Sequence, residues 1–205
     1  MTTFFLVRHA VTSHTGKKLT GWLDGVPLTD EGREQATAVA EQLADVKFDA
    51  IYSSPILRTL KTAEAIAARH DVQVKTTRGL GEVEYGKWTD RPIKVLARTK
   101  LWSAVQRWPS SVRFPEGETL REVQTRAVDE MERLTAEHPK ATLCCVSHGD
   151  VIKLVLAHYM GVHIDLFQRI VIAPASISVI ALSDRGPAIL SLNASPMSIP
   201  RKGGG

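Results

Sequence analysis

Residues 143–149 read LCCVSHG, and a helical pattern follows them over 151–160. The uninterrupted apolar run at 143–146 is typical of a strand that is buried on both faces. A similar short run, FFLV at 4–7, ends directly before Arg8 and His9. Strands of this kind need helices on both sides, so the two runs predict a mainly parallel sheet inside an α/β protein.

The rest of the chain alternates between strand and helix patterns. Short β-prone runs are separated by stretches whose apolar residues recur every three or four positions, which is the helical period. Strands are expected at 4–7, 50–52, 72–76, 143–146, 177–182 and 188–192, and helices at 31–43, 56–70, 92–107, 118–138 and 151–160. This order predicts an α/β fold, a three-layer α/β/α sandwich with a mostly parallel, doubly wound sheet.

The length and composition suit one globular domain. The chain has 205 residues, 43% of them hydrophobic and 23% charged, which excludes collagen-like, disordered and disulfide-scaffold proteins. We expect a single domain over 1–195 with a small helical cap inserted at about 87–118. A flexible tail is expected over 196–205, where the sequence has little to bury.

The positive charge of the chain is concentrated in one segment. The formal net charge is +4, and residues 87–113 alone hold seven Lys and Arg against one acid, Asp90. Such a run indicates either the solvated face of a helix or a basic lid that selects anionic substrates. Nucleic acid is the competing partner for a basic protein. The sequence has no helix-turn-helix, zinc finger or RNA-binding motif, so we expect no nucleic-acid partner.

Cysteine usage and the N-terminus indicate the compartment. Cys144 and Cys145 are adjacent, so they cannot join distant segments, and they lack the spacing of a metal site. Free thiols fit a reducing compartment, and the N-terminus lacks the basic and long apolar regions of a signal peptide. No apolar run approaches the ~20 residues that span a bilayer. We therefore expect a cytoplasmic protein with no membrane partner.

Basic and titratable side chains follow several of the predicted strands. Arg8 and His9 end the first strand, Arg58 lies one helical turn beyond the second, Glu82 follows the third, and His148 ends the fourth. The carboxyl ends of parallel strands meet at one edge of a sheet, so we expect these side chains to converge. Arginine matches the oxygens of a phosphoryl group, a neutral imidazole can attack phosphorus, and a carboxylic acid can protonate the leaving oxygen. The set predicts cleavage of a phosphate ester with no metal and no other cofactor.

Motifs spread along residues 4–193 carry a resemblance to a known family. They are LVRHA at 6–10, LT at 28–29 with Gly32 and QA at 35–36, SSP at 53–55 with Arg58 and TA at 62–63, Leu80, Glu82, YG at 85–86 with Trp88, PEGET at 115–119 and VSHG at 146–149. In this order and spacing the chain resembles the histidine phosphatase superfamily, in its phosphoglycerate-mutase-like branch.

The resemblance implies a role for each matching residue. It makes His9 the nucleophile that becomes phosphohistidine and Glu82 the general acid, whose carboxylate would then activate water to attack phosphohistidine. The residues expected to bind the phosphoryl oxygens are Arg8, Thr15, Arg58, His148 and Gly149. The implied enzyme is a phosphoric monoester hydrolase of the histidine acid phosphatase type.

Three positions need a decision between alternatives. Ala10 stands where the commonest family motif has Gly, and a methyl group there is a small change. Thr15 stands where the family usually has Asn, and its hydroxyl can replace one hydrogen bond. Glu84 is the other candidate for the acid, but the spacing of LGEVEYG at 80–86 favours Glu82.

Several functions stay open for such a site. A phosphatase lets water reach phosphohistidine, whereas a phosphoglycerate-type phosphomutase excludes water and holds a second phosphorylated position. Mutases of the family carry an adjacent Arg-Arg pair in a longer cap, and this chain has no such pair. We therefore expect a phosphatase acting on a small-molecule phosphate ester, with a catalytically silent phosphate-binding protein as a further alternative. The resemblance also leaves a homodimer open, with 170–180 as an apolar contact strand or as core.

Overall fold

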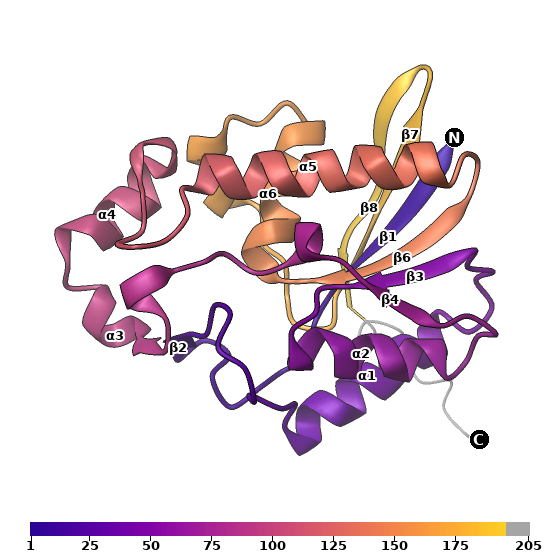
Figure 1. Cartoon of the computed structure of the whole chain (residues 1–205), viewed down its shortest axis with the longest axis horizontal. Coiled ribbons are helices and arrows are strands. Elements are labelled where there is room, and N and C mark those ends of the chain that lie inside the picture. Colours follow the sequence, from indigo (N-terminus) through magenta and orange to yellow (C-terminus); the bar gives the residue numbers. More distant parts are fainter. Residues whose placement is uncertain (196–205) are drawn as a thin grey trace, which may run out of the picture.

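A six-stranded sheet runs through the centre of the computed structural model, which describes residues 1–195 (Figure 1). In spatial order its strands are β4 (Val74–Thr76), β3 (Ala50–Ser53), β6 (Thr142–Ser147), β1 (Thr2–Arg8), β7 (Ile177–Ser183) and β8 (Gly186–Ala194). β4, β3, β6 and β1 run parallel, whereas β7 and β8 continue the sheet antiparallel beyond β1. The predicted α/β fold with a mostly parallel sheet is confirmed.

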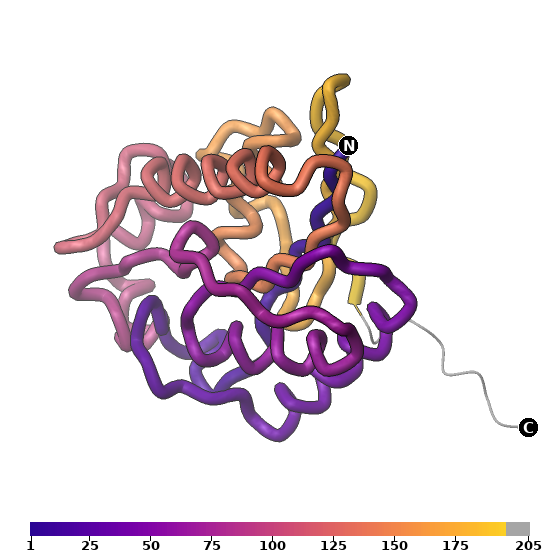
Figure 2. The backbone as a smooth tube through the Cα atoms, turned by 45° about the vertical axis from the view of Figure 1, so that its right-hand side comes forward, coloured from indigo at the N-terminus to yellow at the C-terminus, as the bar shows by residue number. Residues whose placement is uncertain are grey.

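Helices cover both faces of this sheet. α1 (Asp30–Gln42) and α2 (Leu57–Ala67) lie on one face, and α5 (Leu120–Glu137) and α6 (Gly149–Tyr159) lie on the other (Figures 1 and 2). The adjacent cysteines of β6 point to different layers, because side chains alternate along a strand. Cys144 packs in the core beside α1 and α2, and Cys145 packs in the core beside α5 and α6. Burial on both faces explains the uninterrupted apolar run.

Local hydrogen bonds fix where two of these helices begin. Thr29 accepts a hydrogen bond from the N–H of Gly32 at the start of α1, and Thr119 forms a capping box with Glu122 at the start of α5. Gly32 also allows a close approach, because a Cβ there would lie 2.1 Å from the carbonyl oxygen of Val11. α1 is therefore held against the segment that follows β1.

Residues 87–118, which we call the cap, form a group of short elements. This part of the chain begins within the 3-10 helix η2 (Gly86–Trp88) and holds β5 (Arg91–Pro92), α3 (Ile93–Leu96), α4 (Lys100–Arg107) and the 3-10 helix η3 (Pro109–Ser111). β5 pairs with β2 (Lys18–Leu19) in a two-stranded ladder that the sequence did not predict. Figures 1 and 2 place the cap at the end of the molecule opposite the N-terminus, beyond the carboxyl ends of the parallel strands.

The single helix predicted over 92–107 is wrong. Pro92 belongs to β5, and residues 97–99 separate α3 from α4. Thr99 explains the break, because its hydroxyl donates to the carbonyl of Leu96 and accepts from the N–H of Trp102. A threonine that bonds to nearby backbone in this way competes with helix continuation and caps the next helix instead.

The apolar run over 170–180 is mostly core. Its isoleucines at 170, 172, 177 and 180 are buried, whereas Val171 is 66% exposed. On the edge strand β8, Leu190 and Leu192 are exposed as well. The homodimer stays a prediction, and so does the division into one domain with a cap.

Two further predictions concern the ends and the surroundings of the chain. The flexible tail predicted over 196–205 lies outside the described residues. Among residues 1–195, none of the helices combines the length and the apolar character needed to cross a membrane.

Candidate active site

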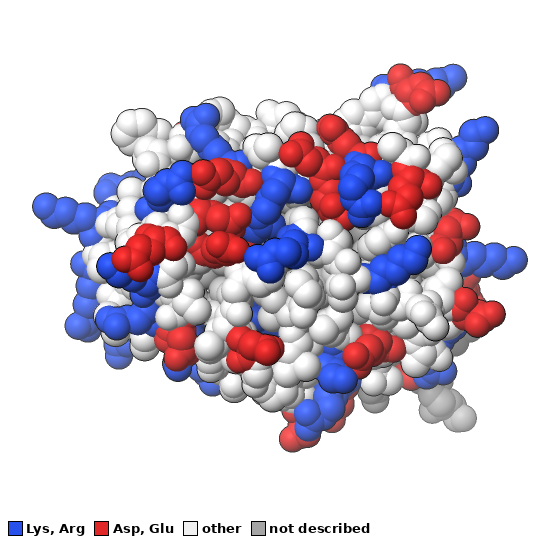
Figure 3. All heavy atoms as spheres, viewed as in Figure 1, with Lys and Arg blue, Asp and Glu red and all other residues white. Residues whose placement is uncertain are grey.

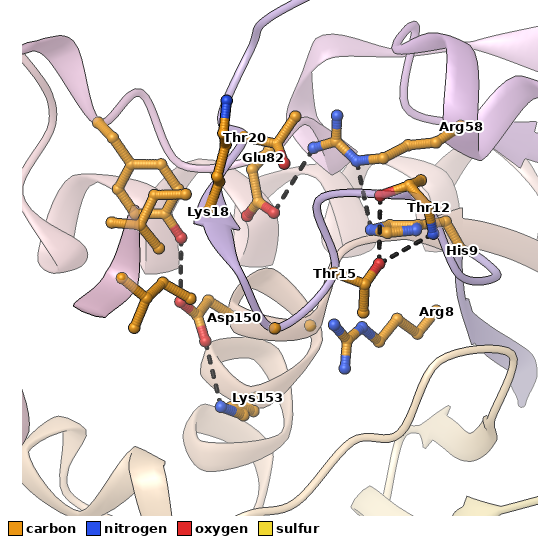
Figure 4. Close-up of a pocket in the computed structure, with 15 residues that line it drawn as sticks. Arg8, His9, Thr12, Thr15, Lys18, Thr20, Arg58, Glu82, Asp150 and Lys153 are labelled. Carbon is orange, nitrogen blue, oxygen red and sulfur yellow. Dashed lines mark hydrogen bonds and ion pairs between the residues drawn. The ribbon is translucent and has the colours of Figure 1, made fainter. Parts of the chain in front are cut away.

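The carboxyl ends of β1 and β6 meet at a cavity of about 200 Å³ (Figure 4). Its lining residues are Arg8, His9, Thr12, Thr15, Gly16, Lys18, Leu19, Thr20, Arg58, Glu82, Tyr85, Ile93, Gly149, Asp150 and Lys153. Every site residue predicted from the sequence belongs to this wall except His148. The structure therefore brings together side chains from widely separated parts of the chain.

His9 presents a neutral imidazole with an electron pair on Nε2. Its Nδ1 lies 2.8 Å from the carbonyl oxygen of Ala10, which can only accept, so Nδ1 carries the proton. Arg58 Nε donates to His9 Nε2 over 3.3 Å, which requires an unprotonated Nε2. Burial and the positive charges of Arg58 and Arg8 hold the pKa of His9 well below its usual value. The imidazole is therefore a nucleophile at neutral pH.

Arg58, near the start of α2, connects the polar groups of the site. The side chain is 1% exposed, and its Nη2 donates to the carbonyl of Gly21 at 2.9 Å and to His148 Nδ1 at 3.1 Å. The same nitrogen lies 3.7 Å from Glu82 Oε2. Its Nη1 is buried without a hydrogen-bond partner among the described residues. A buried cationic N–H of this kind is suited to an anionic oxygen in the cavity.

Arg8 supplies a second guanidinium group. Its Nη1 donates to the carbonyl of Ile172 at 2.6 Å, whereas its Nε is buried without a partner in the described chain. Gly149 leaves room for it, because a Cβ there would lie 3.1 Å from Arg8 Nε. Gly149 also begins α6, which has no side-chain cap, so the first N–H groups of the helix add to the positive potential at the cavity wall.

His148 contacts Arg58 and is not among the residues that line the cavity. It is fully buried, and Arg58 donates to its Nδ1, so Nε2 carries the proton and donates to Ser54 Oγ at 2.9 Å. Burial and the charge of Arg58 hold the pKa of His148 well below its usual value. In this arrangement His148 orients the guanidinium group of Arg58. Its predicted contact with phosphoryl oxygens stays a prediction.

Glu82 is a buried carboxyl group facing the two arginines. Its side chain is 12% exposed, and this burial raises the pKa of Glu82 from 4.5 to about 7, although the charge of Arg58 opposes the shift. The negative charge of Asp150 adds to the increase in this pKa. Glu84, the alternative acid, is half exposed and pairs instead with Arg78 over 3.3 Å. Only the first of the two glutamates therefore has the environment of a general acid.

Two residues that the sequence analysis missed hold the loop of Glu82 in place. Arg126 of α5 donates to three carbonyl groups of this loop, including that of Glu82 at 2.8 Å. Trp22 Nε1 donates to the same Glu82 carbonyl at 2.6 Å. A signal for Arg126 was present, because it lies three residues after Val123, next to the apolar stripe of its helix.

The two departures from the family pattern have different positions. Ala10 is fully buried in the core beside α1 and α2, so its methyl group stays out of the cavity. Thr15 lines the cavity, and its Oγ1 accepts from the N–H of Thr12 at 2.9 Å. Thr15 therefore orders the loop after β1 and places a hydroxyl near the arginines.

The cap brings little of its charge to the cavity. Ile93 is the cap residue that lines it within the described chain. The cavity lysines come from β2 and α6 instead, and neither was predicted: Lys18 pairs with Asp90 at 2.8 Å, and Lys153 pairs with Asp150 at 3.2 Å. No group of three or more His, Cys, Asp or Glu side chains in residues 1–195 is arranged to hold a metal ion.

Comparison with known sequences adds relatives to this geometry. The family model of the histidine phosphatase superfamily (branch 1) matches residues 4–195. Phosphoserine phosphatase 1 of Hydrogenobacter thermophilus is 31% identical over 197 residues, which cover 94% of this chain and 92% of that protein. A probable phosphoglycerate mutase, GpmB of Proteus mirabilis, is 32% identical and covers 85% of this chain and 82% of its own length.

Solved structures show the same fold. A phosphoserine phosphatase from Entamoeba histolytica, in complex with 3-phosphoglyceric acid, superposes with a TM-score of 0.86 at 26% identity. The match covers 95% of this chain and 98% of that one. YhfR of Bacillus stearothermophilus has the same TM-score and coverage at 24% identity, which is a likeness of fold alone.

Proposed function

Because the chain belongs to branch 1 of the histidine phosphatase superfamily, we propose that it hydrolyses phosphate monoesters through a phosphohistidine formed at His9. The observation that carries the proposal is the tautomer of His9. Its proton is held on Nδ1 by the Ala10 carbonyl, which leaves the Nε2 electron pair beside Arg58. Unpartnered N–H groups of Arg8 and Arg58 point to a phosphoryl group as the electrophile.

The first chemical step transfers the phosphoryl group to His9. The Arg58 Nε–H turns from His9 Nε2 to a phosphoryl oxygen, which frees the Nε2 electron pair. That pair forms a bond to phosphorus while the ester P–O bond breaks, and the leaving oxygen takes the proton of Glu82. Arg8 and Arg58 stabilise the negative charge on the phosphoryl oxygens. The Ala10 carbonyl accepts the Nδ1 proton of the resulting phosphoimidazolium, which keeps the ring oriented.

The second step returns the enzyme to its starting state. The Glu82 carboxylate takes a proton from water, the water oxygen bonds to phosphorus, and the P–N bond to His9 breaks with its electron pair returning to Nε2. Glu82 must therefore be an acid in the first step and a base in the second. A pKa of about 7 suits one group that does both.

We assign the enzyme to the histidine acid phosphatase type on the strength of Glu82. Its carboxyl must be protonated when the ester binds, and with a pKa of about 7 the protonated fraction falls above neutral pH. His9 supports the same range, because its lowered pKa keeps the imidazole unprotonated in mild acid. We expect the rate of the first step to fall as pH rises from 6 to 9.

The substrate we propose is a small-molecule phosphate ester. A cavity of about 200 Å³ is smaller than the roughly 300–1,000 Å³ of sites for drug-sized ligands. It has room for a phosphoryl group and a compact alcohol. The phosphoserine phosphatases among the relatives support a substrate of this size.

The test is hydrolysis of p-nitrophenyl phosphate and a panel of small phosphate esters from pH 4 to 9 with EDTA present. We expect wild type to release phosphate and His9→Ala to lose at least about a thousandfold in kcat. Labelled phosphate should remain on the protein after an acid-free quench, and the label should be absent from His9→Ala. His158→Ala, on the exposed face of α6, is the matched control and should retain activity.

Phosphomutase activity is the second candidate, favoured by the named mutases among the relatives. It is tested by incubating the protein with 3-phosphoglycerate and following the phosphorylated position by phosphorus NMR. Movement of the phosphoryl group without release of phosphate would replace the proposed hydrolysis by transfer. A folded protein that binds phosphate with neither reaction would contradict both.

A further inference from the structure

The cavity contains a polar network whose members make and break no bond in the two chemical steps above. Asp150 Oδ2 accepts from the Tyr85 hydroxyl at 3.1 Å, and its Oδ1 accepts from Lys153 Nζ at 3.2 Å. Lys153 also donates to Gln168 Oε1 at 3.1 Å, in the 3-10 helix η4 (Ile164–Arg169). Figure 4 shows Asp150 and Lys153 on the side of the cavity away from Arg58. The network therefore lines the part of the cavity that is left for the alcohol when a phosphoryl group is bound at Arg58.

Asp150 and Lys153 are more enclosed than an ordinary surface pair. Their side chains are 27% and 18% exposed, whereas Lys61 and Glu64, with the same spacing on α2, are 53% and 52% exposed. Withdrawing both charges from water is costly unless partners compensate. Tyr85 and Gln168 supply such partners from other parts of the chain.

A carboxylate in this position works against binding of a phosphoryl dianion. Asp150 lies in the first turn of α6, directly after Gly149, where the helix N-terminus favours anions. The negative charge of Asp150 partly neutralises the positive potential of the helix N-terminus and repels a second anion close by. An ester with an uncharged alcohol would gain nothing from it. A positively charged group on the alcohol would be attracted to it.

Both members of the pair keep unused hydrogen-bonding capacity. A lysine ammonium has three donors, and Lys153 uses two of them, on Asp150 and Gln168. Each carboxylate oxygen can accept two hydrogen bonds, and each oxygen of Asp150 accepts one. The pair can therefore bind two charged groups at once, a cationic group at Asp150 and an anionic group at Lys153.

We propose that Asp150 and Lys153 form the subsite for the leaving alcohol, with Asp150 binding an ammonium group and Lys153 binding a carboxylate of the substrate. The substrate class is then the phosphate ester of a small, free hydroxy amino acid. This inference rests on the proposed hydrolysis at His9 and names the alcohol for it. The same residue within a peptide chain would not use this subsite, because its amino and carboxyl groups are no longer charged.

Four esters separate the two charges in the wild-type protein. They are O-phosphoserine, which has both groups; O-phosphoethanolamine, which has the ammonium alone; 3-phosphonooxypropionate, which has the carboxylate alone; and ethyl phosphate, which has neither. We expect kcat/KM to be highest for O-phosphoserine and to fall by about tenfold for each missing group. Equal values for O-phosphoserine and ethyl phosphate would overturn the subsite.

Two variants assign each preference to its residue. Lys153→Met should lower the ratio of kcat/KM for O-phosphoserine over O-phosphoethanolamine by about tenfold, because the carboxylate loses its partner. Asp150→Asn should lower the ratio for O-phosphoserine over 3-phosphonooxypropionate by a similar factor. Lys61→Met, which removes a lysine of the same spacing outside the cavity, should leave both ratios as in wild type.

The outcomes also separate this inference from the proposed function. If both variants lower kcat/KM for all four esters by one common factor, the network is only structural and the subsite is wrong. If wild type hydrolyses ethyl phosphate and O-phosphoserine with equal kcat/KM, the proposed phosphatase activity stands and only the subsite is wrong. If wild type hydrolyses neither the four esters nor p-nitrophenyl phosphate, both the proposed function and the subsite are wrong.

Discussion

The two arginines of the cavity, Arg8 and Arg58, and the lysines and arginines of the cap are cations in opposite surroundings. These two arginines are held by backbone carbonyls and by the imidazoles of His9 and His148, and burial lowers the pKa of both guanidinium groups. The cap cations Arg91, Lys94, Arg98 and Lys100 are exposed and form no ion pair with the described residues. Figure 3 shows Lys and Arg gathered along the edge of the molecule where α3 and α4 lie.

The difference suits the two groups of cations to different roles. A buried cation is costly unless its N–H groups are satisfied, so its neighbours fix its position closely. Such fixed donors can stabilise charge that develops in a reaction without reorganising. An exposed lysine or arginine is solvated, moves freely and acts over a distance that salt screens. Substitutions in the two regions should therefore differ by orders of magnitude in effect.

Replacing a buried arginine should give the largest loss. Arg58→Gln removes the donor to His9, the donor to His148 and the unpartnered Nη1 together, so we expect kcat/KM for p-nitrophenyl phosphate to fall by about a thousandfold. Arg58→Lys should restore little, because one ammonium cannot reach three directions as a planar guanidinium does. Arg98→Gln in the cap is the matched control. Equal losses in the two regions would contradict the comparison.

Glu82→Gln should give the next largest loss. The amide can neither donate a proton to the leaving oxygen nor accept one from water, so we expect kcat to fall by about 100-fold or more. The loss should be larger for an alkyl phosphate than for p-nitrophenyl phosphate, whose leaving group needs less protonation. Glu84→Gln, which removes an exposed carboxylate two residues away, should keep wild-type kinetics. A loss of similar size in Glu84→Gln would reverse the assignment of the acid.

The fold and the convergence of Arg8, His9 and Arg58 could be predicted because both are imposed by burial. The runs at 4–7 and 143–146 had to be apolar throughout, since helices cover both faces of β1 and β6. Arg8, His9 and Arg58 follow such strands at short, fixed distances in the sequence. Their convergence therefore required only that parallel strands end at the same edge of the sheet. The family expected from these motifs is confirmed by the match over 4–195.

What could not be predicted depends on contacts between distant segments. The β2–β5 ladder has two residues on each side, too few to show a period. Arg126 and Trp22 both donate to the carbonyl of Glu82. The position of Arg126 beside the apolar stripe of its helix suggests an inward-facing side chain, but nothing local in either sequence names the carbonyl that the two residues share. The contact of Asp150 with Tyr85 likewise exists only after folding. The helix break at Thr99 was missed because the apolar spacing over 92–107 is helical throughout, and the sequence does not show that the Thr99 hydroxyl bonds to the Leu96 carbonyl.

Stability at different pH should show the cost of the buried carboxyl group. The pKa of Glu82 is about 7 in the folded protein and close to 4.5 when exposed, so the unfolded chain binds fewer protons between these values. The free energy of unfolding should then fall as pH rises from 4.5 to 7, by about 3 kcal/mol from this group. Glu82→Gln should lack this fall, measured by urea unfolding at pH 5 and pH 8. Parallel curves for the two proteins would show that burial does not raise this pKa.

Neutralising the cap should give the smallest effect, and one of a different kind. The variant carries Lys94→Gln, Arg98→Gln and Lys100→Gln, and all three positions are exposed. Each substitution should therefore change the free energy of unfolding by no more than about 0.5 kcal/mol. We expect kcat to stay at the wild-type value, because these side chains do not line the cavity. Since Ile93 places the cap at the cavity mouth, their combined charge should still attract an anionic ester. We therefore expect kcat/KM to fall by about two- to threefold at low ionic strength and to match wild type near 1 M salt. A loss that persists in high salt would mean that the cap binds the ester directly, and the contrast between fixed and solvated cations would no longer hold.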